Sequence, residues 1–162
     1  MRWTNGFLVL VAIVVATAGL HAIERGPLPA LSLADIAGRP VTTSQIAMTG
    51  TWLIVYVQPG CRPCESIITV ATHERHPGLP DRLAVVVAGA GARELQAFAA
   101  RFPNLPESAW YGDADRTMFT RLRLSGVPVV IGLRGQMIEW GLSGVLPDAA
   151  AVESVLASWI AR

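Results

Sequence analysis

Three short runs of the sequence are almost wholly apolar and rich in β-branched residues. They read TWLIVYV (Thr51–Val57), RLAVVVA (Arg82–Ala88) and PVVIGL (Pro128–Leu133). A run without polar alternation predicts a strand that is covered on both faces of its sheet. The chain must therefore supply helices to cover those faces. Helical spacing of apolar residues occurs between and after the runs, over residues 61–73, 92–102, 113–122 and 149–160.

The predicted elements follow the order β-α-β-α-(β-α)-β-β-α. Trp110-Tyr111 is predicted as a short strand, and Met137–Gly141 as the second arm of a hairpin with the third apolar run. Strands joined by helices pair in parallel, whereas a hairpin adds antiparallel pairing. The sequence thus predicts an α/β fold with a mixed central sheet flanked by helices, preceded by a small extension over residues 31–50.

The N-terminus carries a long apolar segment, Gly6–Ile23, which contains no Asp, Glu, Lys or Arg. As a helix it would be about 27 Å long, close to the thickness of a hydrocarbon core. The sequence favours a membrane anchor, and the alternative is a signal peptide cleaved near Ala18. We expect residues 1–23 to form this anchor or signal, residues 24–30 a linker, and residues 31–162 one domain on the extracytoplasmic, periplasmic side.

The charged residues exclude several kinds of function. All 13 basic residues are arginine, and the net charge is only +1. Without lysine there is no Schiff-base chemistry, and without a basic excess no nucleic-acid partner is expected.

The two cysteines of the chain, Cys61 and Cys64, lie directly after the first apolar run, with Arg62 and Pro63 between them. Pro63 fits the first turn of a helix that begins here. The helix N-terminus and Arg62 both favour a thiolate on Cys61, the more N-terminal of the two thiols. Cys64 is then placed to attack a mixed disulfide formed on Cys61. Outside the cytoplasm such a pair can form a disulfide.

The sequence offers two other uses for the cysteine pair, a structural disulfide and half of a metal site. A structural disulfide across so short a loop would restrain little entropy of the unfolded chain. A metal site would need further ligands, and His73 and His76 are expected about three turns along the helix, roughly 15 Å or more away. We therefore expect a redox-active disulfide, no metal and no other cofactor.

The combination of motifs resembles the thioredoxin superfamily. A strand leads into Cys61-Arg62-Pro63-Cys64 and a helix, and Gly126-Val127-Pro128 leads into a later strand and hairpin. The N-terminal segment and residues 33–46 are similar to those of its membrane-anchored branch, the TlpA-like thiol–disulfide oxidoreductases. The resemblance covers roughly residues 31–160 and implies a thioredoxin-like fold.

The resemblance also implies roles for individual residues. Cys61 would be the nucleophile, Cys64 the resolving thiol and Pro128 a cis-proline beside the pair. The backbone of Val127 would receive an extended substrate, and Gly60, Arg62 and Pro63 would complete the substrate surface.

Three positions depart from the family pattern. Gly60 stands where members carry Trp, Val55 where thioredoxins carry a buried Asp, and Ile67 where the cytochrome-maturation branch carries Glu.

The functional expectation is an extracytoplasmic thiol–disulfide oxidoreductase that reduces protein disulfides, with a membrane electron donor as partner. Two alternatives stay open. The missing Trp and Asp would fit a peptide-binding module that has the same fold but no turnover. The stabilisation of the Cys61 thiolate by Arg62 would fit a thiol oxidase.

Overall fold

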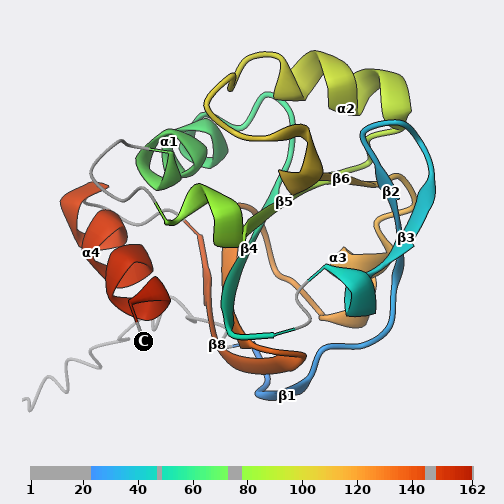
Figure 1. Ribbon diagram of the computed structural model, residues 1–162. Coiled ribbons are helices and arrows are strands. Elements are labelled where there is room, and N and C mark those ends of the chain that lie inside the picture. Colours follow the sequence, from blue (N-terminus) through green and yellow to red (C-terminus); the bar gives the residue numbers. More distant parts are fainter. Residues whose placement is uncertain (1–22, 47–48, 73–77, 145–148, 162) are drawn as a thin grey trace, which may run out of the picture.

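The computed structural model describes residues 23–46, 49–72, 78–144 and 149–161. Residues 1–22 of the predicted N-terminal anchor or signal, His73 and His76 lie outside these residues. Within them the strands form a single mixed sheet in the order β1-β8-β7-β4-β5-β6-β2-β3 (Figure 1). No helix in the described part of the chain is long and apolar enough to cross a membrane.

The predicted order of strands and helices is confirmed, with bounds that differ at some ends. The first central strand coincides with the predicted run, whereas the second and third helices are shorter than predicted. The strands are β1 (Gly26–Pro27), β2 (Ser32–Asp35), β3 (Pro40–Thr42), β4 (Thr51–Val57), β5 (Leu83–Ala88), β6 (Trp110–Asp113), β7 (Val129–Arg134) and β8 (Met137–Ser143). The helices are α1 (Arg62–Ala71), α2 (Ala92–Ala99), α3 (Thr117–Arg121) and α4 (Ala149–Ile160), with 3-10 turns at Thr43–Gln45, Pro80–Arg82 and Glu107–Ala109.

The central strands are apolar throughout because each face of the sheet is covered. On β4, Leu53, Val55 and Val57 point into a core shared with α1, α2 and α4. Ile54 and Tyr56 point into a second core, which α3 and the segment before β4 cover. The alternation along one strand therefore fills two separate cores.

The strand directions bring several loops to one end of the sheet. β4 pairs in parallel with β5, and β5 with β6, while β7 runs antiparallel to β4. The carboxyl ends of β4, β5 and β6 therefore lie at the end where β7 begins and β8 finishes. We call this the dithiol end, because the loop after β4 carries the two cysteines.

The segment predicted as a linker is packed on the sheet over part of its length. Gly26 pairs with Ile138 and Pro27 with Met137, which forms the short strand β1. Leu28 is buried, and its N–H donates to the backbone oxygen of Gln136 at 2.8 Å. A two-residue strand that contains proline has no alternating pattern, so no sequence signal distinguishes it from a linker.

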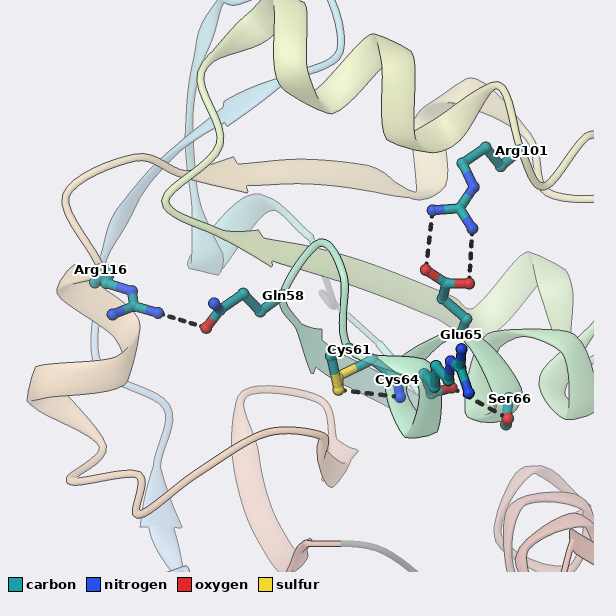
Figure 2. The surroundings of a disulfide bond; sticks show 8 residues. Gln58, Cys61, Cys64, Glu65, Ser66, Arg101 and Arg116 are labelled. Carbon is teal, nitrogen blue, oxygen red and sulfur yellow. Dashed lines mark hydrogen bonds and ion pairs between the residues drawn. A yellow bond between two sulfur atoms is a disulfide. The ribbon is translucent and has the colours of Figure 1, made fainter.

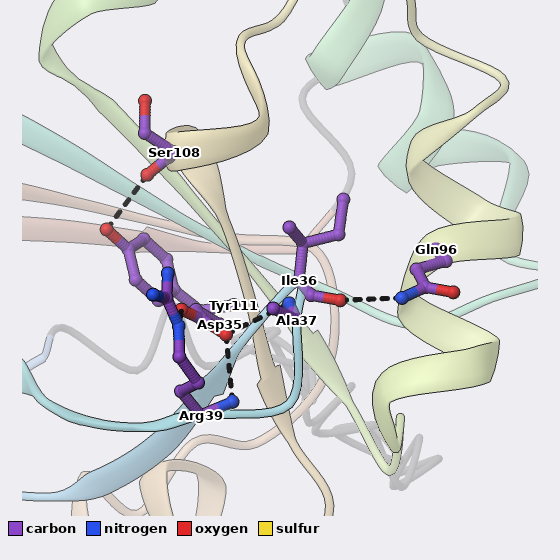
Figure 3. A network of polar contacts seen from close by, with 7 residues as sticks. All are labelled: Asp35, Ile36, Ala37, Arg39, Gln96, Ser108 and Tyr111. Carbon is purple, nitrogen blue, oxygen red and sulfur yellow. Dashed lines mark hydrogen bonds and ion pairs between the residues drawn. The ribbon is translucent and has the colours of Figure 1, made fainter.

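The turn between β2 and β3 is organised by one carboxylate (Figure 3). Asp35 accepts hydrogen bonds from the backbone N–H groups of Ala37 and Arg39, both at 2.9 Å, and pairs with the Arg39 side chain at 2.7 Å. These donors, the Arg39 backbone N–H first, lower the pKa of Asp35. Gln96 on α2 donates to the Ile36 carbonyl oxygen at 2.9 Å, so the turn is also fastened to a helix.

Candidate active site around Cys61 and Cys64

A tight turn connects β4 to the first cysteine. The backbone N–H of Cys61 donates to the carbonyl oxygen of Gln58 at 3.3 Å, which closes the turn through Pro59 and Gly60. Gly60 has a φ of +80°, a left-handed conformation that costs other residues about 1–2 kcal/mol. Gly60 therefore allows the chain to adopt this turn without strain. The family pattern, which has Trp at this position, did not suggest that role.

The two cysteines are joined as a disulfide and differ sharply in exposure. Cys61 is partly exposed and caps α1, whereas Cys64, in its first turn, is fully buried. The backbone N–H of Cys64 donates to the Cys61 sulfur at 3.3 Å (Figure 2). Pro63 occupies the first turn, as predicted. A sulfur that caps a helix is the one whose negative charge the helix stabilises.

Glu65 follows the dithiol but is already engaged. Its two carboxylate oxygens receive hydrogen bonds from Arg101 at 2.9 and 2.7 Å (Figure 2). The Arg101 guanidinium carbon also lies 5.6 Å from the ring centre of Phe98 and 5.9 Å from that of Phe102. This bidentate pair fastens α1 to the segment after α2, so we assign Glu65 a structural role.

On the other side of the dithiol, a contact links two loops that are distant in sequence. Arg116, whose φ is +55°, donates to the side-chain oxygen of Gln58 at 2.6 Å (Figure 2). Its guanidinium carbon lies 5.7 Å from the ring centre of Phe119. Arg116 thus steadies the turn that precedes Cys61. Sequence analysis missed this residue, because a contact across 58 positions leaves no local pattern.

Asp113 is the one carboxylate that is buried among the described residues, with 2% exposure. It accepts hydrogen bonds from the Tyr56 hydroxyl at 2.9 Å and from the backbone N–H groups of Thr117 at 2.8 Å and Met118 at 3.0 Å. The two backbone donors explain why α3 starts only at Thr117, while Asp113 belongs to β6 because it pairs with Ala88.

Asp113 cannot take the place of the buried Asp that thioredoxins carry at the position of Val55. Tyr56 and Met118 belong to the second core, whereas Cys64 belongs to the first, so the sheet separates Asp113 from the buried thiol. Burial and the neighbouring Asp113 carboxylate raise the pKa of Tyr56 well above its ordinary value. Asp113 therefore anchors the start of α3 from the end of β6, whereas the sequence predicted a helix that begins at Asp113 itself.

Val127 and Pro128 lie at the same end of the sheet as the cysteines, joined by a cis peptide bond. Val129 pairs with Tyr56, so continuing the register by one residue places Pro128 opposite Val57, at the start of the cysteine loop. Val127 is partly buried and contacts both cores. The carbonyl oxygen of Pro128 accepts a hydrogen bond from Gly144 at 2.9 Å.

The described residues contain no group of three or more His, Cys, Asp and Glu side chains that could hold a metal ion. Gly60 and Arg62 are exposed, Cys61 and Val127 are partly exposed, and Pro128 is buried beneath them. Such an arrangement can exchange a disulfide with a thiol that approaches Cys61.

Comparison with known proteins gives a fold but no close relative. No protein-family model matches the chain, and a search among curated proteins found no match. Among solved structures, a putative thiol:disulfide interchange protein DsbE from Chlorobium tepidum is 16% identical, with a TM-score of 0.64 over 85% of this chain and 99% of that chain.

Two further structures are similar. A secreted thiol-disulfide isomerase from Corynebacterium glutamicum is 14% identical, with a TM-score of 0.63 over 91% of this chain and 96% of that one. An uncharacterized thioredoxin-like protein from Porphyromonas gingivalis is 17% identical, with a TM-score of 0.60 over 83% and 92%. The chain thus has a thioredoxin-like fold, as the sequence predicts.

Proposed function

We propose that this thioredoxin-fold protein is a thiol–disulfide oxidoreductase of the extracytoplasmic space that reduces protein disulfides. The observation that carries the proposal is the asymmetry of the dithiol: Cys61 is partly exposed at the start of α1, and Cys64 is buried behind it. The similar structures, whose names include a thiol:disulfide interchange protein and a thiol-disulfide isomerase, support it.

The reaction follows from the two positions. In the reduced protein the Cys61 thiolate attacks a disulfide of the substrate, forms a mixed disulfide and releases one substrate thiolate, which takes up a proton. Cys64 then loses its proton and attacks the Cys61 sulfur, which releases the second substrate thiolate. The substrate gains two electrons, and the protein is left with the Cys61–Cys64 disulfide. Val127, Pro128, Gly60, Arg62 and Pro63 are the residues we propose to line the substrate.

The proposal includes a donor and a location. The oxidised dithiol must be reduced again, and the apolar segment Gly6–Ile23 favours a membrane anchor and a thiol donor in the same membrane. A soluble domain released after cleavage near Ala18 is the alternative.

Trapping tests the chemistry. The Cys64→Ser variant should accumulate a covalent complex with insulin on non-reducing gels, because Cys61 attacks and nothing resolves the product. The matched Cys61→Ser variant should trap far less, since Cys64 is buried. The unmodified chain should reduce insulin. Trapping by neither variant, together with no insulin reduction, would exclude an oxidoreductase and favour a peptide-binding module.

The reduction potential tests the direction. A value near about −270 mV, as in thioredoxin, fits a reductase, whereas a value near about −120 mV is that of a strong oxidant. The second result would reverse the proposed direction and favour a thiol oxidase.

A further inference from the structure

The apolar segment joins the domain at the dithiol end. Ile23 is 9% exposed and packs on Gly141 of β8, where an added Cβ would meet the Ile23 side chain at 2.4 Å. β1 is antiparallel to β8, with Gly26 opposite Ile138. Following the chain backward from Pro27 to Ile23 therefore leads toward the last residue of β8. Ile23 therefore lies within about two residues, or roughly 7 Å, of the end of β8.

The neighbours of Ile23 confirm this position. Ile23 and Glu24 line a pocket of about 190 Å³ together with Ser125 and Ser143. Ser125 and Ser143 have hydroxyl oxygens 3.4 Å apart, and Ser143 pairs with Val129. Ile23 and Glu24 thus lie beside the loop that leads into Val127 and Pro128.

Three arginines lie along the stretch of chain from Ile23 to Pro27, which adjoins this pocket. Arg25, Arg121 and Arg123 line an adjoining pocket of about 340 Å³, with Glu24 as the one carboxylate among its lining residues. All three are exposed, and none has an ion pair or a side-chain hydrogen bond within the described residues. By contrast, Arg39, Arg101 and Arg134 pair with carboxylates. We call Arg25, Arg121 and Arg123 the arginine cluster.

We propose that the dithiol end of the domain faces the bilayer and that the arginine cluster contacts anionic lipid headgroups. The inference rests on the proposed membrane anchor. An anchor that reaches the domain at a buried residue restricts how far the domain can turn away from the membrane. Basic side chains next to such an anchor gain about fivefold in association with an anionic surface per residue. The partner that reaches Cys61 is then one presented at the level of the headgroups.

Fluorescence quenching tests the orientation in the full chain. In a Cys61→Ser, Cys64→Ser background, a fluorophore is attached through Ser125→Cys at the dithiol end or through Met137→Cys at the opposite end, where Met137 is 48% exposed. The protein is placed in vesicles of phosphatidylcholine, with or without an equal part of phosphatidylglycerol, that contain a headgroup-linked quencher. We expect several-fold stronger quenching at position 125 than at 137 in anionic vesicles.

Charge variants identify the contact. Arg25→Gln, Arg121→Gln and Arg123→Gln together should reduce quenching at position 125 to the level in pure phosphatidylcholine. The matched control removes three charges from the opposite end, through Arg39→Gln, Arg82→Gln and Arg134→Gln. It should leave the quenching at position 125 unchanged. Equal quenching at both positions, stronger quenching at 137, or recovery of the chain in the soluble fraction would overturn the proposal.

A second measurement keeps the cysteines. Neutral dithiothreitol should reduce Cys61–Cys64 several-fold more slowly in anionic than in neutral vesicles, and the triple variant of the arginine cluster should remove the difference. Equal rates in the unmodified chain would contradict the proposed orientation. These readouts need no insulin reduction, so failure of the orientation is distinguishable from failure of the oxidoreductase assignment.

Discussion

At the scale of single residues, position relative to α1 separates two chemically identical thiols. Cys61 caps the helix and is partly exposed, while Cys64 is enclosed in the first core. Sequence analysis predicted the place of Cys61 at the helix N-terminus, because it depends only on where the helix begins, whereas the burial of Cys64 depends on tertiary packing. It did not predict the partner of Gln58, because Arg116 reaches it from another strand end.

A buried tyrosine gives a residue-scale prediction on pH. The raised pKa of Tyr56 means that the folded protein keeps a proton that the unfolded chain releases above pH 10. The free energy of unfolding should therefore fall above pH 10, by at most about 1.4 kcal/mol per pH unit for this group, and be unaffected by Tyr56 below it. Urea unfolding at a series of pH values measures this dependence.

The Tyr56→Phe variant should weaken the alkaline loss of stability. At neutral pH it should lower the free energy of unfolding by about 1.5–3 kcal/mol, because Asp113 loses one donor to its buried charge. Tyr111→Phe is the control: its hydroxyl donates to the Ser108 carbonyl oxygen at an exposed site, so a smaller loss is expected. An unchanged free energy of unfolding in the Tyr56→Phe variant would contradict the role given to the Asp113 hydrogen bond.

At the scale of elements, local signals predicted the strands β4 to β8 and the start of α1, whereas β1, β2 and β3 were not predicted and tertiary contacts set the remaining bounds. The apolar run of β4 was recognisable because both cores demand apolar side chains. The start of α3 was not, because the Asp113 carboxylate, fixed by its contacts with Tyr56 and Met118, determines it. The strand β1 depends on β8 as its partner and carries no pattern of its own.

Gly132 on β7 provides an element-scale prediction. An added Cβ at this position would lie 2.2 Å from the indole of Trp140 on β8, at the irregular register between the two strands. Gly132→Ala should therefore lower the free energy of unfolding by about 1–3 kcal/mol, as overpacking does. Gly78→Ala is the matched control, since nothing lies within 4 Å of its added Cβ. Equal stability of both variants in urea would show that Trp140 can move without cost.

At the scale of the whole molecule, the sheet brings the cysteine loop, the Val127–Pro128 loop and the end of the apolar segment to one end. Sequence analysis predicted the first two as neighbours through resemblance. It treated residues 24–30 as a linker and so gave no position for the apolar segment relative to the site.

Gly141 tests how firmly this arrangement is held. Gly141→Ala would place a Cβ 2.4 Å from Ile23 and should displace that side chain from β8. We expect trypsin to cleave after Arg25 several-fold faster, with a smaller effect on global unfolding, because β1 lies at the edge of the sheet. Cleavage after Arg101, which is followed by Phe102, serves as the internal control. An unchanged cleavage rate at Arg25 would mean that Ile23 is not needed to hold the segment.

The enclosure of Cys64 has a kinetic consequence. Among the described residues the one buried carboxylate, Asp113, lies across the sheet from Cys64. We expect the base that removes the Cys64 proton to come from the bound client or from water admitted with it. A client that supplies this base would be released quickly, and one that does not would stay covalently attached, so the lifetime of the complex itself would discriminate among clients.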